Sequence, residues 1–335
     1  MTIERFGTLN GQDVLQVSLK GPDGMAMQVL TWGAVVRDLV VPLAGSSQRV
    51  VLGLNSIEDY VAHSPYFGAI VGRYGNRIGK AQFILNGETY GLDANEGENQ
   101  LHGGSKGFGT RLWSIVDHTS SSVTLSLVSE DGDMGYPGRL VATCTYTLLP
   151  SLRLRIELAA TTDKPTPVNL TTHGYFNLDG GPDISSHELT IAGDFITPTR
   201  PDLIPTGEIV SVAGTDYDFT APRPIHGAQP TLYDINYVLR GPYGELRRAA
   251  TLASRQNGLS MELWTTEPGV QFYDGHLIDM PVQVQGLGGT RYGRHGGLCL
   301  EPQRFPDSPN KAHFPSSILP RGQVSRQVSE LRFSR

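Results

Sequence analysis

Apolar and polar residues alternate with a period of two in several stretches of this chain. Residues 152–158 read Leu-Arg-Leu-Arg-Ile-Glu-Leu, so every apolar side chain would lie on one face of an extended strand. Helical geometry would scatter the same side chains around an axis. Similar alternation or short β-branched runs recur at residues 50–52, 123–127, 141–149, 189–191 and 259–265. The chain is therefore expected to be rich in strands.

Turn and helix signals agree with this interpretation. Residues 83–85 and 88–90 flank Asn86-Gly87, a dipeptide that accepts the positive φ angles of a tight hairpin turn. Helical evidence is limited to short pieces such as residues 56–60. Here Ser56 can cap one or two turns, and the Asp59 side chain can accept a hydrogen bond from the Ser56 backbone N–H in return. Charged residues make up only 18% of the chain, which argues against long solvent-exposed helices.

The arrangement of these signals predicts the architecture. We find no repeat of 20 to 50 residues and no Ser/Gly or charged linker between strand-rich and helix-rich halves. Residues 1–335 are therefore expected to form a single large antiparallel β-sandwich domain, all-β with only short helices. Gly and Pro together number 62 of 335 residues, which indicates many turns but remains below the level typical of disorder.

Charge, hydropathy and cysteine content restrict the binding partners and the cellular compartment that we expect. A net charge of −6 provides no basic surface for nucleic acid, and the apolar stretch 29–43 is interrupted by Arg37 and Asp38. Cys144 and Cys299 both lie in apolar runs typical of buried strands, so no disulfide framework is expected. Residues 1–6 lack the pattern of a signal peptide. We expect a cytoplasmic protein that binds neither nucleic acid nor membrane, as a monomer or homodimer.

Four short motifs match known sites only superficially. Residues 103–107 fit a G-x-S-x-G nucleophile elbow, but the Gly-Phe-Gly sequence that follows does not start a helix. Gly79-Lys80 lacks the first glycine and the Ser/Thr of a phosphate loop, and residues 286–291 lack the third glycine of a dinucleotide fingerprint. The nine histidines form no His-x-x-x-His group, so no dedicated metal site is expected, although scattered ligands could converge. No cofactor is indicated.

Five polar segments also carry Gly, Pro or aromatic residues, where a solvated loop would favour Ser, Lys and Glu. Together with two further segments, and in this order along the chain, they resemble the aldose 1-epimerase family, the mutarotases. The resemblance spans most of the chain. The segments are 71–79 (VGRYGNRIG), 99–104 (NQLHGG), 169–178 (NLTTHGYFNL), 233–236 (YDIN), 265–273 (TTEPGVQFY), 300–307 (LEPQRFPD) and 306–310 (PDSPN).

The resemblance implies a galactose mutarotase-like supersandwich that interconverts the α and β anomers of free aldohexoses such as galactose and glucose, without a cofactor. Opening a cyclic hemiacetal requires a base at the anomeric hydroxyl and an acid at the ring oxygen. By similarity, Glu301 is the base and His173 the acid. The residues that the resemblance assigns to substrate binding are Arg73, His102, Asp234, Tyr175 and Gln271.

Glutamate and histidine have ordinary pKa values close enough for burial or neighbouring charges to tune both. We expect activity to require ionised Glu301 and protonated His173, which gives a bell-shaped pH profile whose alkaline limb belongs to the imidazole. A neighbouring Arg73 would favour ionised Glu301, and nearby carboxylates would keep the proton on His173. His226, His276, His295 and His313 are expected to be structural or at the surface.

Alternatives remain open at this point. Asp234 and Glu301 could be the paired carboxylates of a glycoside hydrolase, and Arg73 and Asp234 would also suit a non-catalytic sugar-binding sandwich. An epimerase for a pentose, a deoxy sugar or a phosphorylated hexose is a third possibility. The chain departs from the family pattern at Gly174 and at Ile235-Asn236, which predicts an altered sugar preference and leaves the acid and the base unchanged.

Overall fold

The structure is a computed structural model that describes residues 2–226 and 231–335. Strands dominate these residues, and all pairs of named strands are antiparallel. The largest sheet has nine strands, in spatial order β11 (Ser114–His118), β12 (Ser122–Ser129), β13 (Leu140–Leu149), β14 (Arg153–Thr162), β28 (Val324–Ser334), β24 (Ser260–Thr265), β23 (Arg247–Ser254), β18 (His187–Ile191) and β21 (Arg223–Pro224). A second sheet has six strands, in the order β17 (Tyr175–Phe176), β26 (Leu298–Gln303), β25 (Gly269–Tyr273), β22 (Asp234–Leu239), β19 (Gly193–Thr197) and β20 (Val210–Ser211). A third sheet has five strands, in the order β1 (Thr2–Leu9), β2 (Gln12–Lys20), β3 (Ala26–Leu30), β4 (Val36–Leu43) and β5 (Ser46–Arg49).

The remaining strands pair in twos, and helices are short. The two-stranded sheets are β6 (Ala69–Val71) with β16 (Thr171–His173), β7 (Arg77–Ile78) with β10 (Gln100–Leu101), β8 (Gln82–Leu85) with β9 (Glu88–Gly91), and β15 (Thr166–Pro167) with β27 (Ile318–Leu319). Within the described residues the helices are α1 (Ile57–His63) and the 3₁₀ turns η1 (Gly79–Ala81), η2 (Phe108–Thr110), η3 (Asp133–Gly135), η4 (Leu287–Gly289) and η5 (Ser308–Asn310).

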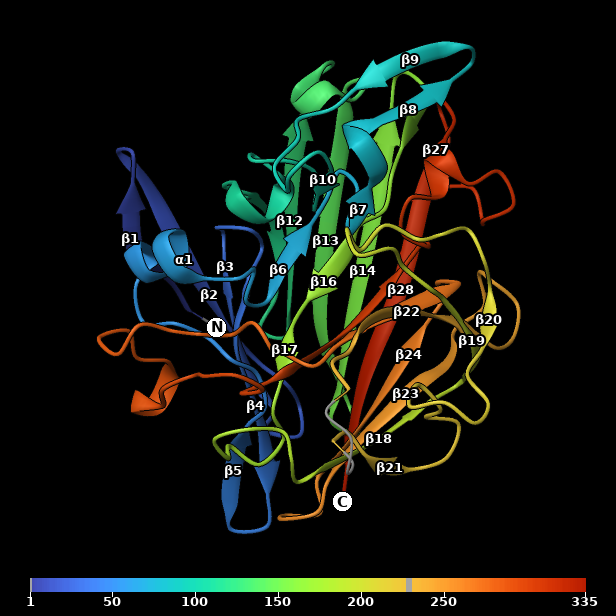
Figure 1. Ribbon diagram of the computed structural model, residues 1–335. Coiled ribbons are helices and arrows are strands. Elements are labelled where there is room, and N and C mark those ends of the chain that lie inside the picture. Colours follow the sequence, from blue (N-terminus) through green and yellow to red (C-terminus); the bar gives the residue numbers. More distant parts are fainter. Residues whose placement is uncertain (1, 227–230) are drawn as a thin grey trace.

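The nine-stranded and six-stranded sheets pack through a shared apolar core. Leu263 and Leu331 of the larger sheet and Phe272 and Leu300 of the smaller sheet belong to one cluster of buried side chains. In Figure 1 the long strands β13, β14 and β28 form the centre of the molecule, with the N-terminal strands in blue at the left. The prediction of an all-β sandwich with only short helices is confirmed.

The same cluster extends from Val17 in β2 to Phe333 in β28, so one core receives side chains from almost the whole chain. On this ground we propose that residues 1–335 form one domain. No helix among residues 2–226 and 231–335 is long and apolar enough to cross a bilayer.

Most local predictions agree with the structure. Residues 153–158 of the alternating run lie in β14, with Leu152 in the turn before it, and the Asn86-Gly87 turn joins β8 to β9 with both residues at positive φ. Ser56 caps α1, where its hydroxyl accepts the backbone N–H of Asp59. The prediction of a strand at residues 50–52 is wrong, because this segment makes only a one-residue bridge from Val51 to Phe176.

Candidate active site

Strand register gathers polar side chains on one face of the six-stranded sheet. Directly paired residues share a face, and the face alternates along each strand. Glu301 in β26 pairs with Gln271 in β25, which pairs with Asn236 in β22. Cys299 lies two residues from Glu301 in β26, so it has the same face. It pairs with Tyr175 in β17 and with Tyr273 in β25, and Tyr273 pairs with Asp234 in β22. Glu301, Gln271, Tyr175 and Asp234 therefore lie on one side, although they are far apart in the sequence.

The other face of β26 explains why a carboxylate occurs within an apolar run. Leu298 and Leu300 point into the core shared with the nine-stranded sheet, whereas Cys299 and Glu301 alternate with them and point away from it. Glu301 is nevertheless only 2% exposed, because segments outside the sheet cover it.

Two small sheets bring the cationic and imidazole groups to this face. Arg77 in β7 pairs with Leu101 in β10, and His102 follows directly. His173 ends β16, two residues before Tyr175. The ring of His173 is stacked between Tyr175, at 5.1 Å between ring centroids, and Tyr66, at 5.7 Å. These aromatic rings fix the imidazole and exclude water from it.

Together these side chains surround a pocket of about 150 Å³. It is lined by Pro65, Tyr66, Asn76, Arg77, Glu96, Leu101, His102, His173, Tyr175, Asp234, Tyr273, Leu277 and Glu301. The structure thus brings together the predicted residues Glu301, His173, His102, Asp234 and Tyr175.

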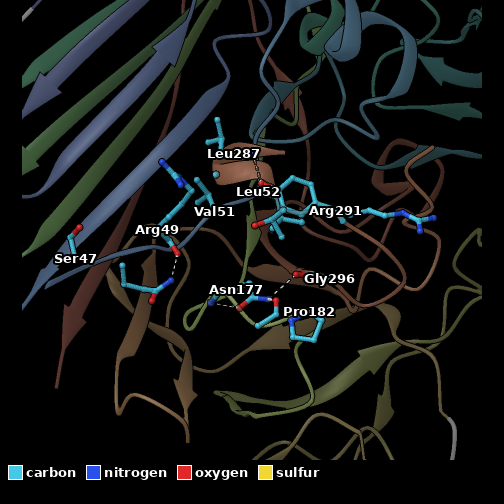
Figure 2. A pocket seen from close by; sticks show the side chains of 15 residues that line it. Ser47, Arg49, Val51, Leu52, Asn177, Pro182, Leu287, Arg291 and Gly296 are labelled. Atoms are coloured by element: carbon cyan, nitrogen blue, oxygen red, sulfur yellow. Dashed lines mark hydrogen bonds between the residues drawn. The ribbon is translucent and has the colours of Figure 1, made fainter. Parts of the chain in front are cut away.

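A second cavity of about 310 Å³ lies between Arg49, Asn177, Pro182 and Arg291 (Figure 2). The Asn177 amide donates hydrogen bonds to the carbonyls of Gly181 and Gly296 and so connects the segments that line this cavity. Asp38 accepts two hydrogen bonds from the Arg49 guanidinium. The residues that line this cavity include no carboxylate or imidazole, so they offer no acid–base pair for the predicted chemistry.

Glu301 and His173 form the central contact of the smaller pocket. Glu301 Oε2 lies 3.8 Å from His173 Nε2, and it has no hydrogen-bond partner among the described residues. Since a buried carboxylate oxygen without a partner is costly, its conformation is suited to a ligand hydroxyl. The two groups lie side by side, so they can address two oxygens that are bonded to the same carbon.

Burial shifts the pKa values of Glu301 and His173 in opposite directions. Removal from water raises the pKa of Glu301 well above its ordinary value; the nearby Asp234 adds to this, and Arg77 opposes it. Removal from water lowers the pKa of His173 to about 4. The expectation that neighbouring charges hold Glu301 ionised and His173 protonated is therefore wrong. Burial outweighs those charges.

His102 is held as a hydrogen-bond donor. Its Nδ1 accepts the backbone N–H of Asn76 at 3.1 Å, so the proton of the neutral ring lies on Nε2. Burial, with His173 and Arg77 nearby, lowers the pKa of His102 well below its ordinary value. His102 is thus a neutral group that can donate from Nε2.

Asp234 is oriented from two sides. Gln271 Nε2 donates to Asp234 Oδ1 at 2.6 Å, and Arg77 Nη1 lies 3.7 Å from Asp234 Oδ2. Gln303 in turn donates to Gln271 Oε1 and Asn236 Oδ1, which fixes the orientation of the Gln271 amide. Gln271 therefore supports Asp234 and does not itself line the pocket.

Arg73 lies elsewhere, and its assignment to sugar binding disagrees with the structure. Its guanidinium is buried and donates to the carbonyls of Ser129, Glu130, Pro137 and Gly138. These bonds tie the β12–β13 connection to the segment that follows β6. The cation in the pocket is Arg77, which also donates to both carboxylate oxygens of Glu96.

The two arginines predict opposite phenotypes. Arg77→Met is expected to lower kcat/KM by roughly 10-fold to 100-fold, because charged hydrogen bonds are worth about 1.5–3 kcal/mol. Arg73→Met should instead lower the free energy of unfolding by about 3 kcal/mol or more, since several buried carbonyls lose their donor. Urea unfolding and kinetics of both variants check this. A catalytic defect in folded Arg73→Met that exceeds that of Arg77→Met would reverse the assignment.

Sequence reasoning missed Arg77, Tyr66 and Glu96. Arg77 lies in the same polar segment as Arg73, and only the β7–β10 register shows which arginine faces the pocket. Tyr66 carries no polar motif and acts through its ring. Ile235 and Asn236, which depart from the family pattern, lie in the core and in the amide network, and Gly174 lies against the Phe176 ring.

Fold and site together define a class: an acid–base enzyme in which one sheet of a β-sandwich presents a buried carboxylate–imidazole pair to a small polar pocket. The sequence profile described as aldose 1-epimerase matches residues 15–332. The chain belongs to this family.

Individual relatives agree along nearly the whole chain. It is 40% identical over 319 residues to galactose mutarotase of Bos taurus, covering 93% of this chain and 92% of that protein. It is 36% identical over 336 residues to aldose 1-epimerase of Escherichia coli K12, covering 97% and 96%. The crystal structure of a GalM/aldose epimerase homologue from C. elegans has a TM-score of 0.90 at 29% identity, covering 96% of this chain and 99% of that chain.

Proposed function

We propose that the protein is an aldose 1-epimerase that interconverts the α and β anomers of free aldohexoses such as galactose and glucose. The observation that carries the proposal is the buried pair of Glu301 and His173, 3.8 Å apart in a pocket lined by hydrogen-bonding groups. Family membership and the galactose mutarotase relatives support the same reaction.

Ring opening follows from the geometry of the pair. Glu301 as carboxylate takes the proton from the anomeric hydroxyl, and His173 gives a proton to the ring oxygen as its bond to C1 breaks. Both oxygens are attached to C1, so the acid and the base must lie close together. After opening, Glu301 is protonated and His173 is neutral.

Ring closure uses the same two groups in reverse. The aldehyde group rotates about the C1–C2 bond, Glu301 returns its proton to the carbonyl oxygen, and His173 takes the proton of the attacking hydroxyl. The pair holds one proton before and after each step. Because burial raises the pKa of Glu301 and lowers that of His173, it favours the form reached after opening, which makes proton removal from the weakly acidic sugar hydroxyl less unfavourable.

The surrounding groups orient the sugar. His102 Nε2–H and the Arg77 guanidinium donate to sugar oxygens, and Asp234 accepts from hydroxyls. Among the described residues that line the pocket, Arg77 is the single arginine or lysine, and it already pairs with Glu96 and Asp234. This supports an unphosphorylated substrate, because no free lysine or arginine is left for a phosphate.

Glycoside hydrolysis is the second candidate, since Glu301 and Asp234 are two carboxylates in one pocket. In that reaction a second carboxyl attacks C1 or activates water. Asp234 is instead engaged by Gln271 and Arg77, and the group beside Glu301 is an imidazole. This arrangement favours epimerisation.

A methyl glycoside separates the two reactions. Polarimetry on freshly dissolved α-galactose should show accelerated mutarotation, whereas methyl α-galactoside should remain unchanged, because it has no anomeric proton to remove. Release of galactose from the methyl or an aryl galactoside would establish hydrolysis. Binding of galactose without either reaction would leave a sugar-binding protein.

The pKa shifts predict which residue sets each limb of the pH profile. Activity needs one proton on the pair, so kcat/KM should fall below about pH 4, where His173 is also protonated, and fall again above the raised pKa of Glu301. The alkaline limb then belongs to the carboxyl, opposite to the expectation from the sequence.

Profiles of two variants, measured with a chelator present, check this assignment. His173→Gln should lose the acidic limb, and its low residual rate should rise with pH through the raised pKa of Glu301, because only the ionised carboxylate can then act as base. A Glu301→Gln variant that keeps the wild-type alkaline limb would instead support the original assignment of that limb to the imidazole.

We also propose that the protein works in the cytoplasm as a monomer or homodimer, without nucleic acid or membrane as partner. A net charge of −6 supports the exclusion of nucleic acid. Size-exclusion chromatography with light scattering measures the oligomeric state.

A further inference from the structure

Cys299 lies directly beside the imidazole of His173. Its Sγ is 3.5 Å from His173 Nδ1, a hydrogen-bond distance for sulfur. Cys299 alternates along β26 with Leu298 and Leu300, so it shares the face of Glu301, and it is fully buried. Cys299 is not among the residues that line the catalytic pocket. The thiol can therefore affect a bound sugar only through His173.

The two ring nitrogens of His173 have different surroundings. Nε2 faces Glu301 Oε2 at 3.8 Å, whereas Nδ1 faces the thiol of Cys299. A hydrogen bond to the main chain of His173 itself opposes the lowering of its pKa, and Nδ1 is the ring nitrogen nearer to the main chain. A carbonyl oxygen can only accept a hydrogen bond, and a thiol sulfur can accept one as well. Both contacts favour a proton on Nδ1.

A proton on Nδ1 is what the proposed reaction requires. Neutral His173 in this tautomer has a lone pair at Nε2, so it can take the proton of Glu301 and become the acid that ring opening needs. With the ring proton on Nε2 instead, the nitrogen that faces Glu301 is blocked, and the pair cannot reach its ionised form. The tautomer of His173 thus decides whether the pair is active.

A thiol can hold this tautomer without making the imidazole a stronger base. Removal from water raises the pKa of Cys299 well above its ordinary value, and the nearby Glu301 adds to this, so the group remains an uncharged thiol. A carboxylate in the same place would favour the protonated ring and raise the pKa of His173. Beside an uncharged acceptor, burial dominates and the pKa of His173 is about 4. His173 is therefore a strong acid once it is protonated.

We propose that Cys299 is a positioning residue that holds His173 in the Nδ1–H tautomer, opposite to the tautomer of His102. The Asn76 N–H occupies Nδ1 of His102 and so places the ring proton of His102 on Nε2. The two ring centroids are only 5.1 Å apart, yet the rings then have different tasks. His102 donates to the sugar, and His173 exchanges protons with Glu301 and the ring oxygen. The effect on catalysis rests on the proposed epimerase function, whereas the tautomer does not.

NMR of ¹⁵N-labelled imidazole rings at neutral pH measures the tautomer directly. The signals of His173 are those that disappear in His173→Gln. We expect the proton of wild-type His173 mainly on Nδ1 and that of His102 on Nε2. Cys299→Ala should shift the tautomer ratio of His173 toward Nε2–H by roughly 3-fold to 10-fold, the effect of losing one weak neutral hydrogen bond. Cys299→Ser keeps an acceptor and should restore most of the Nδ1–H form.

Cys144→Ala is the matched control. Cys144 is the other cysteine of the chain, is equally buried, and lies in the apolar core. Its substitution leaves a hole of similar size but should not change the tautomer of His173. A wild-type His173 with its proton mainly on Nε2 would overturn the assignment. So would a tautomer ratio that is the same in Cys299→Ala and in wild type.

Polarimetry gives the consequence for catalysis. Across wild type, Cys299→Ser and Cys299→Ala, kcat/KM for galactose should fall in proportion to the Nδ1–H fraction of His173, while Cys144→Ala keeps the wild-type value. Calorimetric affinity for galactose should change little, because Cys299 does not line the pocket. A shifted tautomer with unchanged kcat/KM would contradict the role in catalysis. A tautomer that depends on Cys299 in a protein without mutarotase activity would refute the proposed function and leave the tautomer assignment intact.

Discussion

Glu301→Gln is expected to lower kcat by roughly 10² or more while the affinity for galactose changes little. The amide keeps the size of the carboxylate and its ability to hydrogen-bond, but it cannot take the proton of the anomeric hydroxyl. Because Glu301 Oε2 has no partner among the described residues, the substitution breaks no existing hydrogen bond of that oxygen. Progress curves by polarimetry and sugar binding by calorimetry separate the two effects.

Glu267→Gln is the matched control, because Glu267 is also a buried glutamate, 3% exposed, but pairs with Arg304 outside the pocket. It should keep kcat. If Glu301→Gln retained a tenth or more of the wild-type rate, Glu301 would not be the base. A variant that loses binding with kcat intact would identify Glu301 as a substrate ligand only.

His173→Gln should lower kcat by roughly 10²–10⁴, because the ring oxygen then leaves without a proton donor. The stacked rings of Tyr66 and Tyr175 remain, so the pocket is expected to keep its shape. Polarimetry at equal concentrations of folded protein measures the loss.

His187→Gln is the corresponding control for a structural histidine. His187 is fully buried, and its Nε2 accepts the backbone N–H of Leu178 at 2.8 Å. This variant should lose stability while the folded fraction keeps its rate. Similar rates for His173→Gln and wild type would move the role of acid to another group, with His102 tested next.

The elements that the sequence predicts well are those with local causes. Alternation in β14, the Asn86-Gly87 turn and the Ser56 cap each depend on a few neighbouring residues, and all three are present in the structure. The segment at residues 50–52 has the composition of a strand but finds only a one-residue bridge. Pairing partners depend on the whole fold, which composition does not encode.

The predictions for the site also divide into those that the sequence supplied and those that depend on the whole fold. The resemblance supplied Glu301, His173, His102, Asp234 and Tyr175, all of which line the pocket. It did not distinguish Arg73 from Arg77, since the β7–β10 pairing determines which of these arginines faces the pocket.

The protonation of the pair could not be predicted either. The direction of a pKa shift depends on how completely the final packing excludes water from Glu301 and His173.

Polarimetry on freshly dissolved α-galactose, in chelator-containing buffer, tests the central claim most directly. Wild-type protein should bring the rotation to its equilibrium value far faster than buffer alone. An equal concentration of folded Glu301→Gln should accelerate it by roughly a hundredth of that rate or less. A wild-type protein that leaves the spontaneous rate unchanged, or a Glu301→Gln variant as fast as wild type, would contradict acid–base epimerisation by Glu301 and His173.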